Sequence, residues 1–496
     1  MYAKATILVL AGSCAGNVIP DISIRAASTN AAKACSQLKV AFPSNYADST
    51  SSNYGTEKDV NWSTTCRLPA ACFFSPTSTD MVSKGLSIVT KAGSQFAVRN
   101  GGHNPNVNFA SVDGSGVLFD MSQMKTLTLS SDNTILHAGT GNKGGDVQKI
   151  ADSVGRSGVT GLNTGVGISG LTLGGGYTLF SQLNGLVTDN IANFEVVLGD
   201  SSVVNANSTS NIDLYRALRG GGNNFGIVTR FDMKTSPIHN IWFSLFTFDP
   251  KDYEKFMPAL AQVQANMEKD PNANVYFLAS SREVECALFY AKPAGSKPDA
   301  FAPLLNLTPL EVIAPPTNGT VYGLAQAMSP PEPDLGRMIN SMDHKPSADF
   351  YVALYKQLLQ AGAPTGTETD LTLAIKPMGS RVADAGTKQA GGIPNSLNLP
   401  SFSHTWTSIV AQWQDDSDKA QMVKRLNDMN SWLTTNAQKS GLLLPTLFAN
   451  DAGAGQNVMA SYGASSLANL KAVSKKYDTA QVFQKLQAGG FLVSKA

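Results

Sequence analysis

Residues 158–180 read "GVTGLNTGVGISGLTLGGGYTLF" and contain eight glycines. Glycine lets successive backbone N–H groups point together into a concave nest, and such a nest can bind phosphate oxygens without a charged side chain. Two more glycine turns precede this segment, "RNGGH" (99–103) and "HAGTGNKGG" (137–145), and each follows a predicted strand. One such turn alone would be an ordinary tight turn, but three in one half of the chain could surround a pyrophosphate.

The two common nucleotide-binding fingerprints are absent from the sequence. No GxxxxGK[ST] motif occurs, and "GGGNNFG" (220–226) is not a GxGxxG motif followed by an acidic residue about twenty positions later. A P-loop and a dinucleotide-binding Rossmann site are therefore excluded, so a phosphate group must be held in another way.

Hydrophobic periodicity divides the chain into two domains, as expected for 496 residues. Strand and helix patterns alternate over 71–98, where Val82, Leu86 and Val89 have helical spacing, and they continue to about residue 239. Residues 240–445 combine apolar strands with a helix over 418–436, which predicts an α+β domain on an antiparallel sheet. We expect a first domain over 21–239, with its core at about 68–239, and a segment 446–496 that returns to it.

Composition limits the partners of the protein. The net charge is +1, which offers no electrostatic basis for binding nucleic acid or an anionic membrane. After the N-terminus, no stretch approaches the roughly 20 apolar residues of a membrane span. We expect no nucleic acid and no membrane partner, and a monomer or a weak dimer.

The N-terminus and the cysteines predict secretion. Residues 1–20 are typical of a signal peptide, with a buried terminal element as the alternative. Acceptor sequons for glycosylation begin at Asn61, Asn207, Asn306 and Asn318. In an oxidising compartment Cys35 would pair with Cys72 or Cys66, and we favour Cys72. The cysteine spacing suits no zinc site, so we expect no metal.

Three stretches resemble one family of flavoenzymes: "FAVRNGGHNPN" (96–106), "GVGISGLTLGGGYTLFSQLNGLVTDNIANFEVVLGD" (165–200) and "ALRGGGNNFGIVT" (217–229). They look like the FAD-linked oxidoreductases with a PCMH-type FAD-binding domain, in the vanillyl-alcohol-oxidase superfamily, and more narrowly like the berberine-bridge-enzyme-like group. The resemblance is strong over 65–240 and loose over 240–440. It implies a two-domain α+β fold, with a PCMH-type FAD-binding domain and a substrate domain built on an antiparallel sheet.

The resemblance also implies the cofactor site. In this family the loop that is here Arg99, Asn100, Gly101, Gly102 and His103 wraps the FAD pyrophosphate, and its histidine bonds covalently to the flavin 8α-methyl group. A neutral imidazole is a competent nucleophile for such a bond, although a histidine on a turn can equally be a simple hydrogen-bonding residue. Further contacts carried over from the family are Ala138, Gly139, Thr140, Gly141, Val166, Gly167, Gly170, Leu171, Gly174, Gly175, Asp189, Asn190, Ile191, Gly226, Ile227, Val228 and Asn450, each with turn formation or core packing as the alternative.

One position departs from the family in a way that bears on the flavin. Many members form a second bond from a cysteine three residues before the V-G pair, which is here Val166-Gly167, and Asn163 occupies that position. An asparagine cannot form a thioether, so we predict a single link through His103. A doubly linked flavin usually accompanies a wide site for bulky substrates, so its absence argues against an oligosaccharide oxidase.

The catalytic residues are less well defined by the resemblance. The family often has Y-x-N-Y late in the chain, but here Phe448 and Asp451 replace the two tyrosines and only Asn450 remains. The candidates for a general base are then His404, Asp451 and Tyr462. The alternatives are a surface or core role for His404 and packing against the first domain for Tyr462, and Asp451 qualifies only if it reaches the substrate pocket.

The resemblance implies an FAD oxidase, and the N-terminus, the sequons and the cysteines predict that it is secreted. It would transfer a hydride from a small organic metabolite, aromatic or polyketide-like, to flavin N5, with O2 as acceptor and H2O2 as product. An extracellular carbohydrate oxidase is the first alternative. A protein that keeps FAD for binding or for non-redox cyclisation is the second.

Overall fold

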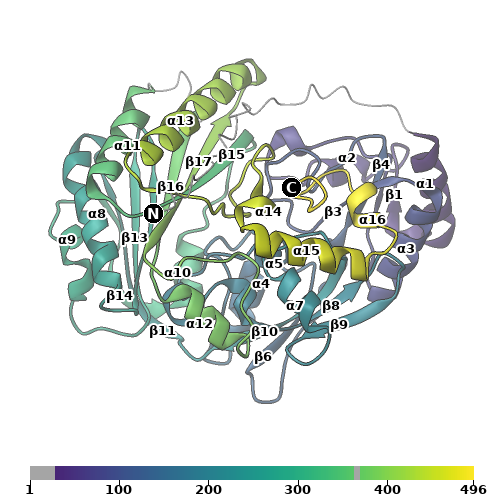
Figure 1. Cartoon of the computed structure of the whole chain (residues 1–496), viewed down its shortest axis with the longest axis horizontal. Coiled ribbons are helices and arrows are strands. Elements are labelled where there is room, and N and C mark those ends of the chain that lie inside the picture. Colours follow the sequence, from purple (N-terminus) through teal and green to yellow (C-terminus); the bar gives the residue numbers. More distant parts are fainter. Residues whose placement is uncertain (1–27, 362–368) are drawn as a thin grey trace, which may run out of the picture.

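The computed structural model describes residues 28–361 and 369–496, and its chain forms one half built on two smaller sheets and another half built on one large sheet (Figure 1). The predicted signal peptide, residues 1–20, lies outside the described residues. Helices and mainly antiparallel strands occur together, which confirms the predicted α+β class.

A four-stranded sheet begins the first half, in the order β1-β2-β4-β3. Its elements are α1 (Thr29–Ala41), β1 (Tyr46–Ala47), α2 (Tyr54–Lys58), β2 (Cys72–Phe74), α3 (Thr79–Ala92), β3 (Gln95–Arg99) and β4 (Gly116–Asp120). The predicted strand–helix–strand unit over 71–98 is confirmed, and Val82, Leu86 and Val89 of α3 are fully buried. Strand β4 lies between β2 and β3 and pairs in parallel with both. The glycine loop after β3 therefore leaves from the edge of this sheet.

A second sheet of six strands completes the first half, in the order β5-β6-β10-β8-β9 with β7 paired to β10. Its elements are β5 (Leu127–Leu129), β6 (Ile135–Gly139), α4 (Gly144–Asp152), β7 (Ser157–Gly158), α5 (Ile168–Leu173), α6 (Ser181–Asn184), the 3-10 helix η4 (Val187–Asn190), β8 (Ile191–Val197), β9 (Val203–Asn207), α7 (Ile212–Leu218) and β10 (Ile227–Ser236). The spacing of Val147, Ile150, Ala151 and Val154 in the sequence predicts one helix face. Helix α4 buries Val147 and Ala151, whereas Val154 follows the end of the helix and is 37% exposed. The glycine-rich segment 158–180 supplies β7, α5 and the loops around them.

The second half is one antiparallel sheet of eight strands, in the order β14-β11-β13-β12-β16-β17-β15-β18. Its strands are β11 (Asn240–Phe248), β12 (Ala273–Ala279), β13 (Val284–Tyr290), β14 (Glu311–Thr320), β15 (Gly336–His344), β16 (Asp370–Met378), β17 (His404–Trp413) and β18 (Leu443–Leu444). Its helices are α8 (Tyr253–Met267), α9 (Ala302–Leu305), α10 (Val321–Ala327), α11 (Ala348–Gln360) and α13 (Lys419–Lys439), whereas α12 (Val382–Gln389), between β16 and β17, packs against α6 of the first half.

Alternation along the strands gives this sheet two different faces. Leu373, Ile375, Ile409 and Ala411 share one core with α8, α11 and α13, and Figure 1 shows these helices on the outer side. The stripe predicted on α13 belongs to this core, since Met422, Leu426, Met429 and Leu433 are all buried. The side chains that alternate with these along the strands, such as Lys376 and Trp406, lie on the opposite face, toward the first half of the molecule. Both of them contact Phe448 there.

Two later segments join the halves. The C-terminal part contains α14 (Val458–Ser461), α15 (Ala464–Tyr477) and α16 (Val482–Lys485), and Figure 1 shows it lying against the first half. Tyr477 and Lys476 on α15 both bond to Asp213 on α7, each at 2.7 Å. Residues 379–403 leave the large sheet after β16, and Val382, Ala390 and Leu397 enter the core of the second sheet.

Cys35 and Cys72 form a disulfide, which confirms the favoured pairing. Cys66 and Cys286 are free and buried. The bond ties α1 to β2, the strand of the four-stranded sheet that lies between β1 and β4. A bond of this kind persists in oxidising compartments and is rare in reducing ones.

The sequons differ in accessibility. Asn61 is only 1% exposed, and its side chain donates to the Ala110 carbonyl and accepts from Arg99. Asn61 is therefore a structural residue in the folded protein, and a glycan cannot be accommodated there. Asn207 is half-buried, whereas Asn306 and Asn318 are exposed.

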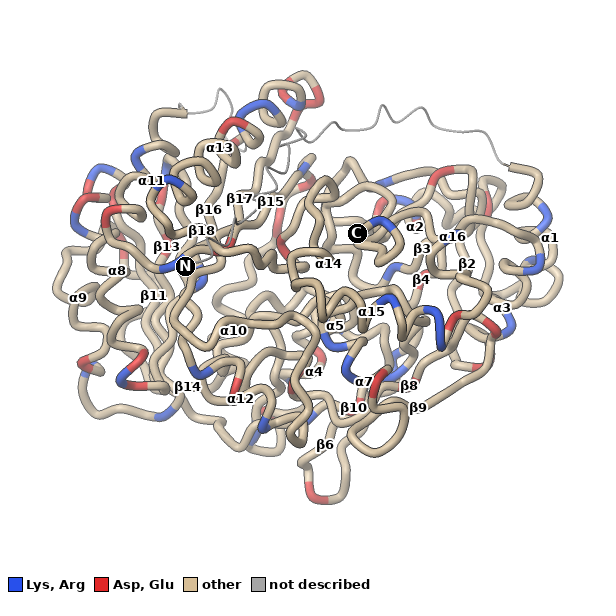
Figure 2. Tube along the Cα trace, in the orientation of Figure 1, with Lys and Arg blue, Asp and Glu red and all other residues tan. Residues whose placement is uncertain are grey.

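Charged residues of both signs are interspersed over the tube in Figure 2, without a large region of one sign. No helix among the described residues is long and apolar enough to cross a bilayer.

Candidate functional site

The glycine loop after β3 and the glycine-rich loop before α5 approach each other at Gly101 and Gly167. A Cβ on Gly101 would lie 2.5 Å from the Gly167 nitrogen, and a Cβ on Gly167 would lie 2.6 Å from the Gly101 nitrogen. Gly102 has φ of +67°, a left-handed conformation that favours glycine. Any side chain at Gly101 or Gly167 would push the two loops apart.

This junction has unused hydrogen-bond donors. Within residues 28–361 and 369–496, the backbone N–H groups of Gly101, Gly102, His103, Asn104 and Gly167 donate no hydrogen bond. Backbone amides that lack a protein partner in a glycine loop are a ready binding site for phosphate oxygens. These residues therefore fit the pyrophosphate of FAD.

The third glycine turn, at the end of β6, differs from the other two because its backbone amides donate hydrogen bonds within the protein. The amides of Gly139, Thr140 and Gly141 donate to the carbonyls of Thr126, Thr229 and Met124, at 2.7–3.0 Å. A Cβ on Gly139 would lie 2.4 Å from the Met124 oxygen. Close packing therefore explains the glycines of this turn, and its backbone donors are already used within the protein.

Arg99 supports the glycine loop from inside the protein. Its guanidinium is 1% exposed and donates twice to Asp120 Oδ2, at 2.5 and 2.7 Å, and once to Asn61 Oδ1, at 3.0 Å. Asn100, the next residue, donates to Ser169 Oγ at 3.0 Å and so connects the loop to α5. The Arg99 side chain thus holds the loop in place through a buried ion pair.

His103 lies in a cluster formed by both halves of the chain. Its ring stacks on Trp62, with 4.3 Å between ring centroids and 14° between planes, and its Nε2 lies 3.8 Å from Glu332 Oε1. Glu332 precedes β15 and accepts hydrogen bonds from Trp62 Nε1 and, at 2.8 Å, from Asn163 Nδ2. Burial raises the pKa of Glu332, but His103, Trp62 and Asn163 outweigh it and hold the pKa at about 2.

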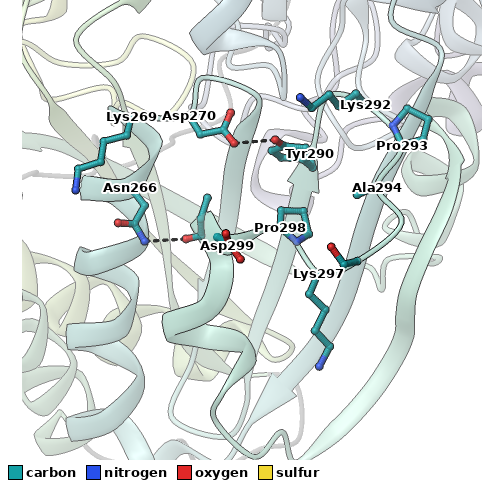
Figure 3. A pocket seen from close by; sticks show the side chains of 12 residues that line it. Asn266, Lys269, Asp270, Tyr290, Lys292, Pro293, Ala294, Lys297, Pro298 and Asp299 are labelled. Carbon is teal, nitrogen blue, oxygen red and sulfur yellow. Dashed lines mark hydrogen bonds between the residues drawn. The ribbon is translucent and has the colours of Figure 1, made fainter.

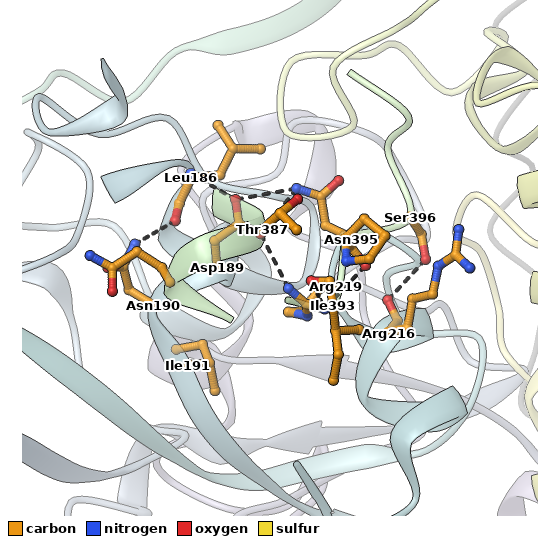
Figure 4. A network of polar contacts seen from close by, with 12 residues as sticks. Leu186, Asp189, Asn190, Ile191, Arg216, Arg219, Thr387, Ile393, Asn395 and Ser396 are labelled. Carbon is orange, nitrogen blue, oxygen red and sulfur yellow. Dashed lines mark hydrogen bonds and ion pairs between the residues drawn. The ribbon is translucent and has the colours of Figure 1, made fainter. Parts of the chain in front are cut away.

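Asp189 in η4 and Arg219 at the end of α7 form a buried ion pair (Figure 4). Both side chains are fully buried, with 3.4 Å between Nη1 and Oδ1, and Asn395 donates to Asp189 at 3.0 Å. Burial raises the pKa of Asp189, against the opposing charge of Arg219. Asn190 Nδ2 donates to the carbonyls of Asn184 and Leu186. These side chains hold the turn between α6 and β8 against the segment 379–403.

The remaining predicted cofactor residues surround α5 and β10. Gly170 is exposed with open space around it, Leu171 is half-buried, and Gly175 has φ of +115°. Gly226 packs against Val196 and Val197, and Ile227 and Val228 are buried in β10. The other members of this group are Ala138, which is buried in β6, Val166, which is half-buried before α5, and Ile191, which is buried at the start of β8.

The C-terminal segment meets both the glycine-rich segment and the large sheet at Asn450 and Asp451. Asn450 Nδ2 donates to the Gly170 carbonyl, its Oδ1 accepts from Gly176 N–H, and a Cβ on Gly174 would lie 2.5 Å from Nδ2. Asp451 Oδ2 forms an ion pair with Lys376 Nζ on β16, and both side chains are mostly buried.

Aromatic rings surround this ion pair. Lys376 Nζ lies 5.6 Å from the centroid of Phe448, which in turn stacks on Trp406 at 4.0 Å. Burial raises the pKa of Tyr276 on β12, and the charge of Asp451 raises it further. The sequence offered no signal for Lys376 or Glu332, because each acquires its partner only when distant segments fold together.

The other two candidate bases occupy interior positions. His404 is fully buried at the start of β17, with Nδ1 3.1 Å from the Phe402 carbonyl, and burial lowers its pKa to about 4. Tyr462 is 1% exposed, its hydroxyl donates to the Gly220 carbonyl at 3.1 Å, and burial raises its pKa. Among the three candidates, Asp451 is the one that pairs with a residue of the sheet's inner face.

Two surface pockets lie away from these loops. One, of about 550 Å³, is bordered by α8 and by the chain after β13, where Tyr290 donates to Asp270 at 2.7 Å (Figure 3). The other, of about 860 Å³, lies between α7 and α15. Within the described ranges no three His, Cys, Asp or Glu side chains are grouped as metal ligands.

Comparisons with known proteins identify an FAD-binding domain in the chain. The family model described as "FAD binding domain" matches residues 70–207. A FAD-dependent monooxygenase of Arthrobotrys oligospora is 33% identical over 466 residues, covering 92% of this chain and 89% of the relative.

Solved structures share the fold at lower identity. The berberine-bridge-enzyme-like 1 protein of Physcomitrella patens has a TM-score of 0.78 at 20% identity, covering 92% of this chain and 99% of the other. Glucooligosaccharide oxidase of Acremonium strictum, whose flavin is described as "6-s-cysteinyl, 8 alpha-N1-histidyl FAD", has a TM-score of 0.72 at 17% identity, with 92% and 99% covered.

The fold and the glycine loops thus define a flavoenzyme with a PCMH-type FAD-binding domain. The chain belongs to the family of the FAD-dependent monooxygenase that it matches over most of its length, and it shares the fold of the berberine-bridge-enzyme-like proteins. It is an FAD-linked oxidoreductase.

Proposed function

We propose that the protein is an FAD-dependent oxidase that acts on a small aromatic or polyketide-like molecule, with O2 as acceptor and H2O2 as product. The observation that carries this proposal is the Lys376–Asp451 ion pair on the inner face of the large sheet, next to the glycine segment that Asn450 contacts. When bound, FAD supplies the acceptor for a hydride from the substrate and passes its electrons to O2.

The cofactor is held chiefly by backbone. Free amides of Gly101, Gly102, His103, Asn104 and Gly167 would bind the pyrophosphate. His103 is the residue that we propose to carry the flavin, by a single bond, because Asn163 occupies the position of the second link in doubly linked relatives. The histidyl flavin of glucooligosaccharide oxidase supports this assignment.

Asp451 is the proposed base. Its carboxylate is adjacent to the sheet face on which a substrate would lie, and Lys376 fixes its orientation. Loss of a hydride from a C–H bond is assisted when a neighbouring O–H or N–H loses its proton, and Asp451 can accept that proton. Tyr276, whose pKa is raised by burial, keeps its proton at neutral pH and can donate a hydrogen bond to the substrate.

The surroundings of this ion pair favour an apolar or aromatic substrate. Phe448, Trp406 and Tyr276 lie nearby, and Leu278 and Val410 are half-buried on the same face. Ligand sites of this kind have mostly apolar walls with a few placed polar groups. The absence of a second covalent link to the flavin also argues against an oligosaccharide substrate.

A second function has a specific observation in its favour. The relative from Arthrobotrys oligospora is named a monooxygenase, so this chain could insert one oxygen atom into its substrate instead of releasing H2O2. Both reactions consume O2, and they differ in where its atoms go.

A substrate panel in air tests the proposal. Purified protein is incubated with phenolic alcohols, polyketide lactones and sugars, and substrate loss, H2O2 and the incorporation of isotopically labelled O2 are measured. We expect H2O2 in a one-to-one ratio with a phenolic or polyketide substrate and no label in the product. Label in the product would assign a monooxygenase, turnover of sugars alone would assign a carbohydrate oxidase, and a flavin that no compound reduces would refute both redox functions.

We also propose that the protein is secreted and glycosylated. The Cys35–Cys72 disulfide supports secretion. Asn306 and Asn318 are the accessible sequons, and Asn318 Nδ2 already donates to the Ala294 carbonyl, so Asn306 is the first choice for a glycan. Peptide mass spectrometry of the protein from a secreting host would test both assignments.

A further inference from the structure

A carboxylate from the second half of the chain lies between the two positions that concern flavin attachment. Glu332 Oε1 is 2.8 Å from Asn163 Nδ2 and 3.8 Å from His103 Nε2. Asn163 is itself anchored, because its Oδ1 accepts from Gly165 N–H at 2.8 Å. Asn163, at the proposed position of the absent second flavin link, therefore holds Glu332 in place. The Glu332 carboxylate in turn faces His103, the proposed attachment residue.

The histidine ring is held in a defined plane. It stacks on Trp62, and the Arg337 guanidinium lies 4.2 Å from the same indole ring. Arg337 also approaches Glu332 Oε2 at 3.8 Å and donates to the Trp62 carbonyl at 2.5 Å. The ring therefore directs Nε2 toward Glu332, and Nδ1 is the remaining nitrogen.

We infer that Glu332 is a positioning residue for covalent attachment of the flavin to His103, and that Asn163 holds Glu332 in place for this role. The inference rests on the proposed histidyl link. A carboxylate that faces one ring nitrogen keeps the proton there, leaves the lone pair on the other nitrogen, and stabilises positive charge on the imidazole. In a catalytic triad an acidic residue orients a histidine through a hydrogen bond, and here Glu332 acts on His103 through its charge at 3.8 Å.

The attachment step balances with O2 as oxidant. A bond forms between His103 Nδ1 and the flavin 8α carbon, while one C–H bond of the 8α-methyl group and the Nε2–H bond break. The Nε2 proton leaves through Glu332, which is partly exposed, to solvent. The two electrons reach O2, which takes up two protons and leaves as H2O2.

Replacement of Glu332 by glutamine tests the inference. Apoprotein from a riboflavin-starved host is mixed with FAD in air, and covalent flavin is followed by acid precipitation and by flavin fluorescence in denaturing gels. We expect E332Q to bind FAD but to attach it about 10- to 100-fold more slowly, the range for removal of carboxylates that orient histidines. The matched control is D334N, since Asp334 is on the same segment, 75% exposed and paired with Arg67.

The outcomes separate this inference from the proposed link. No covalent flavin in the wild-type protein, or unchanged attachment in H103A, refutes the link itself. Covalent flavin in the wild type with equally fast attachment in E332Q refutes the role of Glu332 alone. If E332Q binds no FAD, N163A provides the test, because it keeps the carboxylate but removes its anchor: slower attachment supports the inference, and wild-type attachment in N163A overturns it.

Discussion

Lys376 Nζ and Asp451 Oδ2 form an ion pair between β16 of the large sheet and the C-terminal segment, and both side chains are largely withdrawn from solvent. The pair brings together the two halves of the chain at the place where Asn450 contacts the glycine-rich segment. Asp451 is the proton acceptor that we propose on this face.

Replacement of Asp451 by asparagine should therefore lower kcat by about 100- to 10,000-fold, the usual contribution of a positioned general base. FAD content should not change. Steady-state H2O2 production and the flavin spectrum measure the two effects. D428N is the control, because Asp428 forms an exposed pair with Lys424 on α13; full activity in D451N would exclude Asp451 as the base.

Alanine at Gly101 or Gly167 should abolish FAD binding. Each added Cβ would lie within 2.6 Å of a backbone nitrogen of the opposite loop, so the loops must separate and the amides lose their arrangement. The flavin-to-protein absorbance ratio after purification is the measurement. G55A is the matched control, since nothing lies within 4 Å of a Cβ there, and normal FAD content in G101A would contradict the proposed cradle.

Arg219 should be required for stability rather than for chemistry. Its replacement by leucine leaves Asp189 buried without its charge partner, which costs about 3–5 kcal/mol. Thermal unfolding of R219L should therefore begin well below that of the wild type. The double variant R219L/D189N should recover part of the loss, and a double variant as unstable as R219L would show that the ion pair is not the cause.

His404 and His344 should make the protein sensitive to mild acid. Burial lowers both pKa values from 6.5 to about 4 in the folded state. The unfolded chain then binds more protons than the folded chain below pH 6.5, so stability is complete above that pH and is lost as the pH falls toward 4. Each histidine contributes up to about 3 kcal/mol to the fall in the free energy of unfolding between these pH values.

Melting temperatures from pH 7.5 to pH 4.5 measure the effect. The slope of melting temperature against pH should be smaller in H404Q than in the wild type. If H404Q and the wild type have the same slope of melting temperature against pH, burial of His404 is not a cause of the acid sensitivity.

Local patterns in the sequence were sufficient for much of the fold. Hydrophobic patterns located α3 and α13, and the second strand of the unit predicted over 71–98 appears as β3. The insertion of β4 between β2 and β3 could not be predicted in this way, since pairing between distant strands leaves no periodic signal. The end of α4 before Val154 was missed for a similar reason, because a helix boundary depends on the contacts that follow it.

By itself the sequence determined the class of protein, through glycine turns next to strands and a histidine in one of them. Tertiary structure decided which of these groups are free to act. Arg99, Asp189 and Asn61 are used in buried contacts, whereas Lys376 and Glu332, which have no local motif, lie beside Asp451 and His103. The physical reason is that backbone conformation is encoded by neighbours in sequence, but the charge and hydrogen-bond partners of a side chain are set by whatever the folded chain brings to it.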